Sequence, residues 1–351
     1  MNLHGEKNLK KYIVAVVGVT GAVGEEMLRV LEEHEIPVGT LVPLASKSSA
    51  GKIIEFDEKE WKVQELTEDS FQKNGVEIAL FSAGGSISEK YAPHAVEAGA
   101  VVIDNTSHFR MNRDVPLVVP EVNKGAMENW RDRGIIANPN CSTIQMVQAL
   151  KPLDDTYGIE RVDVATYQAT SGAGKSAMEE LGNQMKDFFE FKLDKSEHKS
   201  FPHQIALNVI PQIDKFMESG YTKEEEKMIF ESQKILEKEF QISATCVRVP
   251  TFRGHAESVS VLCKSEVNAD EVRNILAESP NLIVIDEPSE NSYPMPVMSL
   301  ERDETFVGRI RKDLYNPNML HFWVVADNLR VGAATNAVRI AKSWIEMEEE
   351  N

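Results

Sequence analysis

The chain has 351 residues, of which 42% are hydrophobic and 27% are charged, and its formal net charge is −18 at pH 7. Its length is sufficient for about two domains with sizeable cores, and its composition is typical of an ordinary soluble globular protein. The acidic balance argues against nucleic acid or an anionic membrane as a partner, and no apolar run approaches the ~20 residues that a membrane span requires.

The number and spacing of the cysteines indicate whether disulfides or a metal site are expected and which cellular compartment is favoured. The three cysteines, Cys141, Cys246 and Cys263, lie far apart and form no Cys-x-x-Cys motif. We therefore expect neither a disulfide framework nor a metal site, and we expect a reducing cytoplasm. Residues 1–10 are polar, so the sequence predicts no secretion signal.

The first predicted elements form the entry to a dinucleotide-binding unit. A continuous apolar run over 12–17 predicts a strand that is buried on both faces. A glycine-rich turn follows at once, and then an amphipathic helix begins. Glycines in such a turn let the backbone approach a pyrophosphate, to which the helix N-terminus offers N–H donors, although a plain tight turn is the alternative. The candidate cofactor-binding residues here are Gly18, Thr20, Gly21, Ala22, Val23 and Gly24.

Further alternation of strands and helices predicts a parallel sheet with crossover connections. Strands are expected at 41–45, 78–81 and 101–104, with a helix over 86–98. The second strand ends in Ser46-Lys47-Ser48-Ser49, with no acid before Glu55. An acid there would bind the ribose hydroxyl of NAD, whereas hydroxyls and a cation suit the 2′-phosphate of NADP. We therefore favour NADP, with Ser82 and Gly84 after the third strand at the same edge of the sheet.

A cysteine motif divides the chain. Asn138-Pro139-Asn140-Cys141-Ser142-Thr143 places Cys141 at the start of a helix. That location favours an anion and is expected to lower the pKa of the thiol. The motif alone is compatible with a nucleophile or with a small buried residue.

The second half of the chain has longer strands and fewer helices. Strands are expected at 160–169, 244–252, 256–264, 304–312 and 319–326, and helices at 174–191, 222–239 and 332–347. The predicted fold class is α/β, with a Rossmann-like parallel-sheet domain and an α+β catalytic and dimerisation domain whose sheet is mostly antiparallel. We place the first domain at 1–140 with 329–351, because the last helix is expected to return to it, and the second at 141–328.

The chain resembles aspartate-semialdehyde dehydrogenase of the bacterial type, nearly from end to end. The motifs that carry the resemblance are the Gly18–Gly24 turn, Ser107-His108-Phe109-Arg110, the Cys141 motif, Gln168, Ser171-Gly172-Ala173-Gly174, Glu224 with Lys227, Arg248, Arg253-Gly254-His255 and Asp327-Asn328-Leu329-Arg330. The resemblance implies NADPH-dependent reductive dephosphorylation of L-aspartyl 4-phosphate to L-aspartate 4-semialdehyde. It further implies a cysteine thioester, a place in lysine, threonine, methionine and diaminopimelate biosynthesis, and a homodimer or homotetramer.

The resemblance also implies roles for individual residues. Cys141 is the nucleophile, His255 the acid–base group and Gln168 the residue that orients the substrate. The side chains that bind substrate and phosphate are Arg110, Asn140, Glu224, Lys227 and Arg248. Ser171 and Gly172 are expected beside the nicotinamide ribose, and Asn328 near its carboxamide.

Several alternatives stay open at this point. His108 is a rival base because Arg110 lies nearby, and Glu224 with Lys227 also fits a solvated surface pair. Relatives commonly have an arginine where this chain has Ser48, which leaves use of NAD alongside NADP open. The alternative functions are an N-acetyl-glutamyl-phosphate reductase-like enzyme and a catalytically silent dinucleotide-binding sensor.

Overall fold

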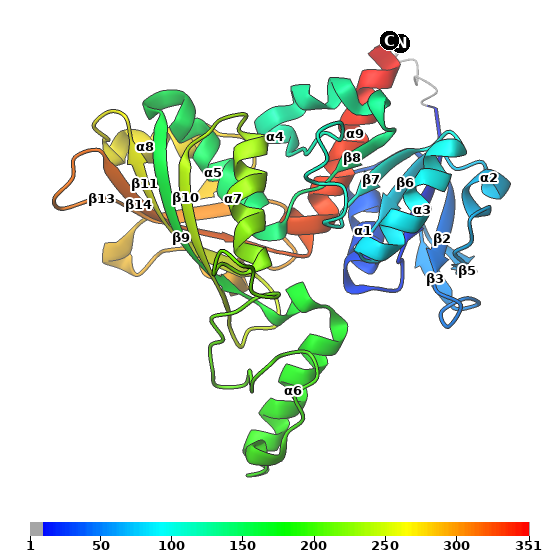
Figure 1. Cartoon of the computed structure of the whole chain (residues 1–351), viewed down its shortest axis with the longest axis horizontal. Coiled ribbons are helices and arrows are strands. Elements are labelled where there is room, and N and C mark those ends of the chain that lie inside the picture. The colour runs from blue at the N-terminus through cyan, green and yellow to red at the C-terminus, as the bar shows by residue number, and fades with distance from the viewer. Residues whose placement is uncertain (1–9, 351) are drawn as a thin grey trace, which may run out of the picture.

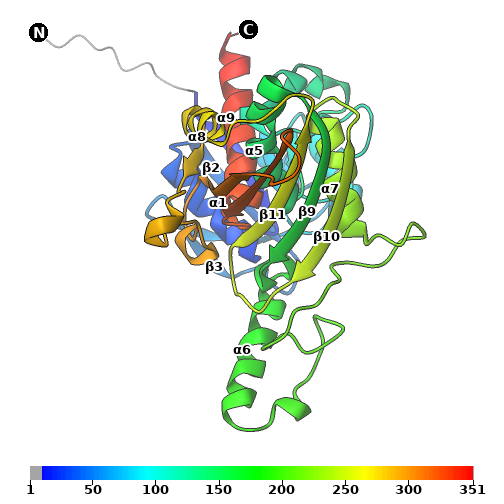
Figure 2. The same ribbon diagram turned by 90° about the vertical axis from the view of Figure 1, so that its left-hand side faces the viewer.

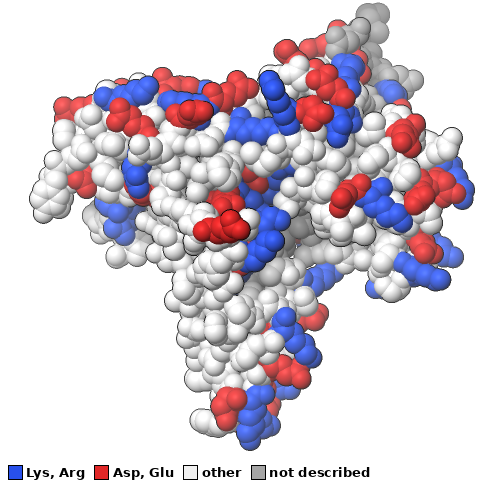
Figure 3. Space-filling view, in the orientation of Figure 1, with Lys and Arg blue, Asp and Glu red and all other residues white. Residues whose placement is uncertain are grey.

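The computed structural model describes residues 10–350, which form two lobes and a projecting arm (Figure 1). The expectation about a secretion signal concerns residues 1–10 and so falls almost entirely outside this range. Each lobe is built on a six-stranded sheet. Figure 3 shows acidic and basic side chains close together where the arm meets the two lobes.

The first lobe contains a parallel sheet in the order β5-β2-β1-β6-β7-β8. Its strands are β1 (Tyr12–Val17), β2 (Val38–Ala45), β5 (Gln64–Glu65), β6 (Ile78–Phe81), β7 (Val101–Asp104) and β8 (Ile135–Ala137). Successive residues of β1 enter different cores: Val14 and Val16 pack with one cluster, and Ala15 and Val17 with another. Burial on both faces explains why this strand is an uninterrupted apolar run.

Helices cover both faces of the first sheet, as a doubly wound fold requires. The face that bears Val14 and Val16 packs against α1 (Ala22–Glu33) and the C-terminal helix α9 (Thr335–Glu350). The opposite face packs against α2 (Ser70–Asn74) and α3 (Gly85–Glu97). The expected return of the last helix to the first domain is therefore seen, although the helix begins with a π-helical turn (Arg330–Ala334) rather than at residue 332.

The second lobe contains a mixed sheet in the order β10-β9-β11-β14-β13-β12. Its strands are β9 (Ile159–Gln168), β10 (Gln241–Arg248), β11 (His255–Cys263), β12 (Leu282–Val284), β13 (Thr305–Lys312) and β14 (Met319–Ala326). Three of its five pairings are antiparallel, whereas β9–β10 and β12–β13 are parallel. Figure 2 shows β9, β10 and β11 side by side.

Three helices cover one face of the second sheet, and a fourth forms the arm. The covering helices are α5 (Cys141–Tyr157), α7 (Lys223–Ile235) and α8 (Ala269–Glu278), whose apolar residues share one core with the strands. Cys246 and Cys263 belong to this core. The arm is α6 (Lys175–Phe189) with a short 3-10 turn (Leu193–Lys195) and the chain that packs back on it (Figure 1).

The sequence misplaced or missed several elements. The strand expected at 244–252 is β10 (Gln241–Arg248), which begins three residues and ends four residues earlier than expected. It ends before Pro250, because proline lacks the N–H that a sheet requires and the chain turns there. Elements that were not predicted are β3 (Ile53–Phe56), β4 (Lys59–Lys62), β5, β8, β12, α2, α8, α4 (Pro120–Asn123) and the 3-10 segments Lys124–Asp132, Thr170–Ala173, Pro288–Glu290 and Pro296–Met298.

Residues 10–350 contain neither a membrane-spanning helix nor a metal-binding cluster. None of the helices in this range is long and apolar enough to cross a membrane. The same range holds no group of three or more His, Cys, Asp or Glu side chains arranged to bind a metal ion.

Candidate active site

Neighbouring strand ends bring two predicted catalytic residues, Gln168 and His255, and one predicted substrate-binding residue, Arg248, to one edge of the second sheet. Gln168 ends β9 and Arg248 ends β10, and the two residues are register partners in a parallel pair. His255 begins β11, which runs antiparallel to β9, so it starts where β9 ends. The three side chains are almost completely buried. Topology therefore gathers residues that lie up to 87 positions apart in the sequence.

Cys141 is the first residue of α5, with Asn140 in the extended conformation that precedes a helix. Its sulfur lies 3.8 Å from Asn140 Oδ1. The predicted location at a helix N-terminus is therefore confirmed, but the expected effect on acidity is wrong. Removal of water from the sulfur and the nearby charge of Glu224 raise the pKa of the thiol to about 12, and Arg248, Arg110 and Lys227 oppose this only in part.

The buried environment of His255 disfavours its charged imidazolium form. Burial and the charge of Arg248 lower the pKa of His255 to about 3, although Glu224 acts in the opposite direction. The backbone N–H of Ala169 donates to Nδ1 at 3.1 Å. A neutral ring that accepts at Nδ1 carries its proton on Nε2. That Nε2 has no hydrogen-bond partner among the described residues, so it is free for a ligand.

Arg248 is a buried cation that forms no ion pair within residues 10–350. Its Nη1 donates to the backbone oxygen of Ala169 at 2.5 Å, and the guanidinium lies 5.9 Å from the ring of Phe201. Burial lowers its pKa. A buried charge is costly unless an anion accompanies it, so this environment suits a ligand carboxylate. Gly172 keeps the space open, because a Cβ there would lie 3.0 Å from Arg248 Nη1 and 3.3 Å from His255 Nε2.

Glu224 forms the acidic side of the site. Its Oε1 accepts from Asn140 Nδ2 at 2.9 Å and from Gln168 Nε2 at 3.2 Å, and its Oε2 lies 3.0 Å from Lys227 Nζ. Burial alone raises the pKa of Glu224, but the attraction of Lys227 and the hydrogen bonds lower it to about 2. The pair is therefore not a solvated surface pair, as the charged helix sequence also allowed.

Glu231 is a part of the site that sequence reasoning missed. It lies one to two helical turns after Glu224 and Lys227 on α7 and is 1% exposed. Its carboxylate accepts from Arg110 Nη1 at 3.0 Å and from the backbone N–H of Asn140 at 2.7 Å. It therefore links Arg110 to the residue before Cys141. The seven-residue spacing from Glu224 was a usable signal, because it places both carboxylates on one helix face.

Gly332 is a second residue that was missed. It lies in the π-helical turn before α9, where a Cβ would fall 2.5 Å from the Cβ of Cys141 and 3.0 Å from its Cα. Only a glycine lets this segment approach Cys141 so closely. A lone glycine at the start of a predicted helix gave no usable signal for this contact.

The glycine turn is shaped for close backbone approach at the carboxyl ends of β1 and β6. Gly18 has a φ of +87°, and a Cβ there would lie 3.0 Å from Ala83. A Cβ on Gly24 would lie 2.3 Å from the oxygen of Gly18. Gly21 precedes the first turn of α1, whose N–H groups point toward the turn without intrahelical acceptors. These features fit a bound pyrophosphate.

The other predicted cofactor residues surround this turn. Thr20 Oγ1 donates to Ser49 Oγ at 3.3 Å, and Ser46 and Ser48 share a hydrogen bond of 2.9 Å. Lys47 is exposed beside them. On the neighbouring strand, Ser82 Oγ donates to the oxygen of Val17 at 3.0 Å, and Gly84 (φ +101°) precedes α3.

Ser171 and Asn328 contact each other and the loop before His255. Asn328 Oδ1 accepts from the backbone N–H of Gly254 at 2.9 Å, and the Ser171 hydroxyl and the Asn328 amide lie within 3.0 Å of each other. Both residues are buried next to the loop that leads into His255. The structure thus brings all the predicted site residues to two adjoining regions.

A dinucleotide-binding parallel-sheet domain beside a partly buried cysteine and a buried arginine and histidine defines a nicotinamide-dependent aldehyde oxidoreductase with a cysteine at its centre. Comparison with known families agrees. The model described as "Semialdehyde dehydrogenase, NAD binding domain" matches residues 13–130, and the one described as "Semialdehyde dehydrogenase, dimerisation domain" matches residues 150–331.

Individual relatives narrow the class. The aspartate-semialdehyde dehydrogenase of Campylobacter jejuni is 58% identical over 339 residues, which cover 97% of this chain and 99% of that protein. The Bacillus subtilis protein of the same name is 50% identical over 337 residues, with 94% and 96% covered. The chain belongs to the aspartate-semialdehyde dehydrogenase family. It is therefore an oxidoreductase of amino-acid biosynthesis with a nicotinamide cofactor.

Solved structures give the same result. Aspartate semialdehyde dehydrogenase II of Vibrio cholerae complexed with ASA superposes with a TM-score of 0.93 at 49% identity and covers 96% of this chain and 99% of that chain. The Candida albicans enzyme with NADP has a TM-score of 0.72 at 25% identity and covers 95% and 98%. The family assignment argues against the silent sensor and against the N-acetyl-glutamyl-phosphate reductase alternative.

Proposed function

We propose that this protein catalyses the reversible, NADPH-dependent reductive dephosphorylation of L-aspartyl 4-phosphate to L-aspartate 4-semialdehyde through a thioester on Cys141. One observation carries the proposal. Cys141 is the first residue of α5, within a site that holds a buried cation, Arg248, which has no ion-pair partner among residues 10–350, and a buried anion, Glu224. An amino acid presents the opposite pair of charges, a carboxylate and an ammonium.

The substrate groups are assigned to complementary side chains. The guanidinium of Arg248 binds the α-carboxylate, because a planar fork with free N–H groups matches a carboxylate. Glu224 binds the α-ammonium, and Lys227 with Arg110 binds the phosphate. Asn140 and Gln168 both donate to Glu224 and hold its carboxylate in place. Gln168 also orients the substrate beside Cys141.

Cys141 forms the thioester. Its thiolate attacks the acyl carbon, the bond from that carbon to the phosphate oxygen breaks, and phosphate leaves with the electron pair. Glu224 raises the pKa of the free thiol, so a substrate ammonium beside Glu224 favours the thiolate. NADPH supplies a hydride to the acyl carbon when it is bound. Cleavage of the carbon–sulfur bond then releases the semialdehyde and restores Cys141.

His255 controls the proton on the reacting oxygen. In the observed geometry its Nε2–H is a donor with no acceptor within residues 10–350, and it is placed to hydrogen-bond a carbonyl or hemithioacetal oxygen. It acts as a base only in the other neutral tautomer, in which the hydrogen bond from Ala169 is lost. The low pKa of the ring keeps it neutral in both forms at pH 7.

The cofactor region supports NADP. The Gly18–Gly24 turn accepts the pyrophosphate, and Ser46, Lys47, Ser48 and Ser49 offer hydroxyls and one cation for a 2′-phosphate. The Candida albicans relative was solved with NADP. Ser171 and Gly172 lie beside the ribose of the nicotinamide, and Asn328 lies near its carboxamide. Because Lys47 is the one cation of the 46–49 segment, weaker use of NAD is also proposed.

The wider context is proposed on the same basis. The enzyme serves lysine, threonine, methionine and diaminopimelate synthesis in the cytoplasm and acts as a homodimer or homotetramer. Residues 1–140 with 329–351 bind the cofactor, and residues 141–328 bind substrate and the second subunit. A family model for a dimerisation domain over 150–331 supports the last assignment.

The test is reduction of NADP and NAD by the purified protein with aspartate semialdehyde, followed by nicotinamide absorbance with and without phosphate. We expect phosphate-dependent activity with a preference for NADP that Lys47→Ala reduces and Lys52→Ala leaves unchanged. Activity that persists without phosphate would refute the proposal that the reaction forms an acyl phosphate. Absence of activity in folded protein would refute the whole proposal.

A further inference from the structure

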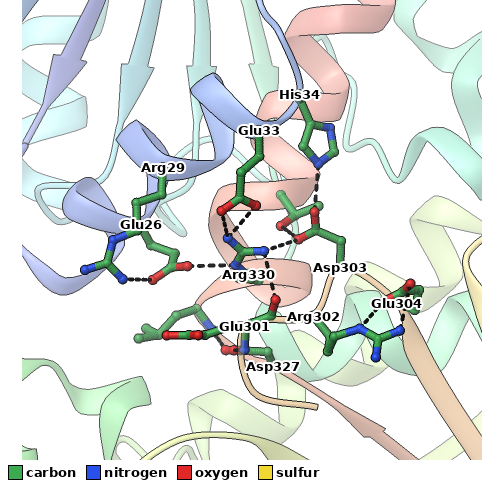
Figure 4. A network of polar contacts seen from close by, with 12 residues as sticks. Glu26, Arg29, Glu33, His34, Glu301, Arg302, Asp303, Glu304, Asp327 and Arg330 are labelled. Carbon is green, nitrogen blue, oxygen red and sulfur yellow. Dashed lines mark hydrogen bonds and ion pairs between the residues drawn. The ribbon is translucent and has the colours of Figure 1, made fainter. Parts of the chain in front are cut away.

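Glu26 is a buried carboxylate that lies between two arginines from distant parts of the chain. It follows the glycine turn by two residues on α1, and its side chain is 4% exposed. Its Oε1 lies 2.7 Å from Arg330 Nε and 3.2 Å from Arg253 Nη2. Figure 4 shows the contact with Arg330 within a larger network. The helix that begins at the cofactor turn is thus joined to one segment of the second lobe, at Arg253, and to the π-helical turn before α9, at Arg330.

Arg253, which contacts Glu26, lies two residues before His255 in the same loop. Arg253 Nε also lies 2.7 Å from Asp327 Oδ2, so its guanidinium is fixed between two carboxylates. The next residue, Gly254, has a φ of +89° and donates its N–H to Asn328 at 2.9 Å. His255 follows directly and begins β11. The position of the imidazole therefore depends on a loop that Arg253 anchors.

Arg330, the other arginine in contact with Glu26, lies in a segment that packs against Cys141. Arg330 begins the π-helical turn in which Gly332 packs on Cys141. Its Nη2 lies 2.6 Å from the carboxylate of Glu33, and its Nη1 donates to the backbone oxygen of Glu301 at 3.0 Å. Arg330 therefore has other anions in reach, whereas the Glu26 carboxylate lies against the guanidinium groups of both Arg253 and Arg330.

Burial without partners would raise the pKa of the Glu26 carboxyl, but the hydrogen bond from Arg330 and the charge of Arg253 lower it. The group is therefore ionised at neutral pH. Removal of one member of a buried charged set leaves the others uncompensated. Such a change is expected to shift the two loops and not merely to weaken the helix.

We propose that Glu26 is a positioning residue for catalysis, which holds the loops that carry His255, Asn328 and Gly332 in register with the cofactor turn. The proposal rests on the proposed roles of His255 and Cys141. It assigns to α1 a second task besides the binding of pyrophosphate. Within residues 10–350, the ion pairs of the Glu26 side chain are with Arg29, Arg253 and Arg330 and not with the glycine turn, so the two tasks are separable by measurement.

The chain provides a matched control. Glu33 lies on the same helix and also pairs with Arg330, but its side chain is half exposed and it does not contact Arg253. We expect Glu26→Gln to lower kcat by about 10- to 100-fold, the cost of a small displacement of catalytic groups. The Kd for NADP, titrated without substrate, is expected to stay unchanged. Glu33→Gln is expected to retain the kcat of the wild type.

A double-mutant cycle tests the coupling itself. Glu26→Gln, Arg253→Lys and the double variant are compared in kcat at saturating semialdehyde, phosphate and NADP. If Glu26 acts through Arg253, the double variant loses no more than the more damaged single variant. Additive losses, or equal kcat in Glu26→Gln and Glu33→Gln, would overturn the proposal.

The design remains decisive if Glu26→Gln does not fold. Arg253→Lys keeps the charge and removes the fork, and it must then show the loss of kcat at unchanged Kd for NADP; a wild-type kcat would overturn the proposal. An active wild type with unaffected variants refutes only this inference. A wild type without activity refutes the proposed function as well.

Discussion

The replacement Arg248→Lys offers the sharpest test of how the substrate is recognised. The guanidinium is 5% exposed, one of its nitrogens is already engaged by the oxygen of Ala169, and its other N–H groups remain for a carboxylate. Lysine keeps the charge but has a single nitrogen, which must serve both acceptors. The variant therefore loses geometry and not charge.

The magnitude follows from the contacts that disappear. A hydrogen bond to a charged group contributes about 1.5–3 kcal/mol, which corresponds to about 10- to 150-fold in an equilibrium constant. One such bond to the substrate is lost when a bidentate grip becomes a single contact. Because the carboxylate is bound equally before and during the reaction, most of the loss is expected in KM for the semialdehyde and little in kcat.

The assay is steady-state reduction of NADP with aspartate semialdehyde varied at saturating phosphate. Arg161→Lys is the matched control, since Arg161 lies on the neighbouring strand β9 and pairs with Asp163 at the surface. We expect the control to match the wild type. A value of kcat/KM for Arg248→Lys within twofold of that for Arg161→Lys, in folded protein, would refute the assignment of the α-carboxylate to Arg248.

Three further predictions concern Cys141 and its surroundings. Cys141→Ala is expected to abolish turnover while NADP still binds in a fluorescence titration, and normal turnover would exclude the thioester. The pKa of the free Cys141 thiol is raised to about 12, so the fraction of thiolate increases with pH up to that value. Alkylation of Cys141 by iodoacetamide is therefore expected to accelerate steadily up to pH 10. A plateau in the alkylation rate near pH 7 would contradict the raised pKa. Gly332→Ala forces a Cβ against Cys141 and is expected to destabilise the fold by about 1–3 kcal/mol and to reduce kcat. Gly125→Ala is the control, because nothing lies near a Cβ at that position. Equal melting temperatures and equal kcat in the two variants would show that the contact is relieved without cost.

The first lobe was largely predictable because its central strands are buried on both faces. Strands β1, β6 and β7 have the predicted bounds, since a continuous apolar run has few other places in a fold. The β3–β4 hairpin was missed for a specific reason. Its turn places Asp57 (φ 51°) and Glu58 (φ 58°) in the left-handed region, where the sequence signal is normally Gly or Asn.

The identity of the site residues was predictable, whereas their electrostatics were not. The position of Cys141 at a helix start was read correctly, but the acidity of its thiol depends on Glu224, which lies 83 residues later in the chain. The contacts of Glu231 with Arg110 and of Gly332 with Cys141 also cross long stretches of sequence. Pairings of this kind arise from the packing of α7 and of the π-helical turn, for which no local pattern exists.

The helix α9 completes the core of the first lobe with residues that follow the whole second lobe in the sequence. Trp344 of α9 packs edge-on against both Tyr12 and Trp130, and Val338 and Ile340 are fully buried in the same cluster. Until α9 has been synthesised, the sheet face that α1 shares with α9 remains only half covered. The nascent chain therefore displays apolar surface throughout translation of the second lobe, and the fluorescence of Trp344 reports the moment at which that surface closes.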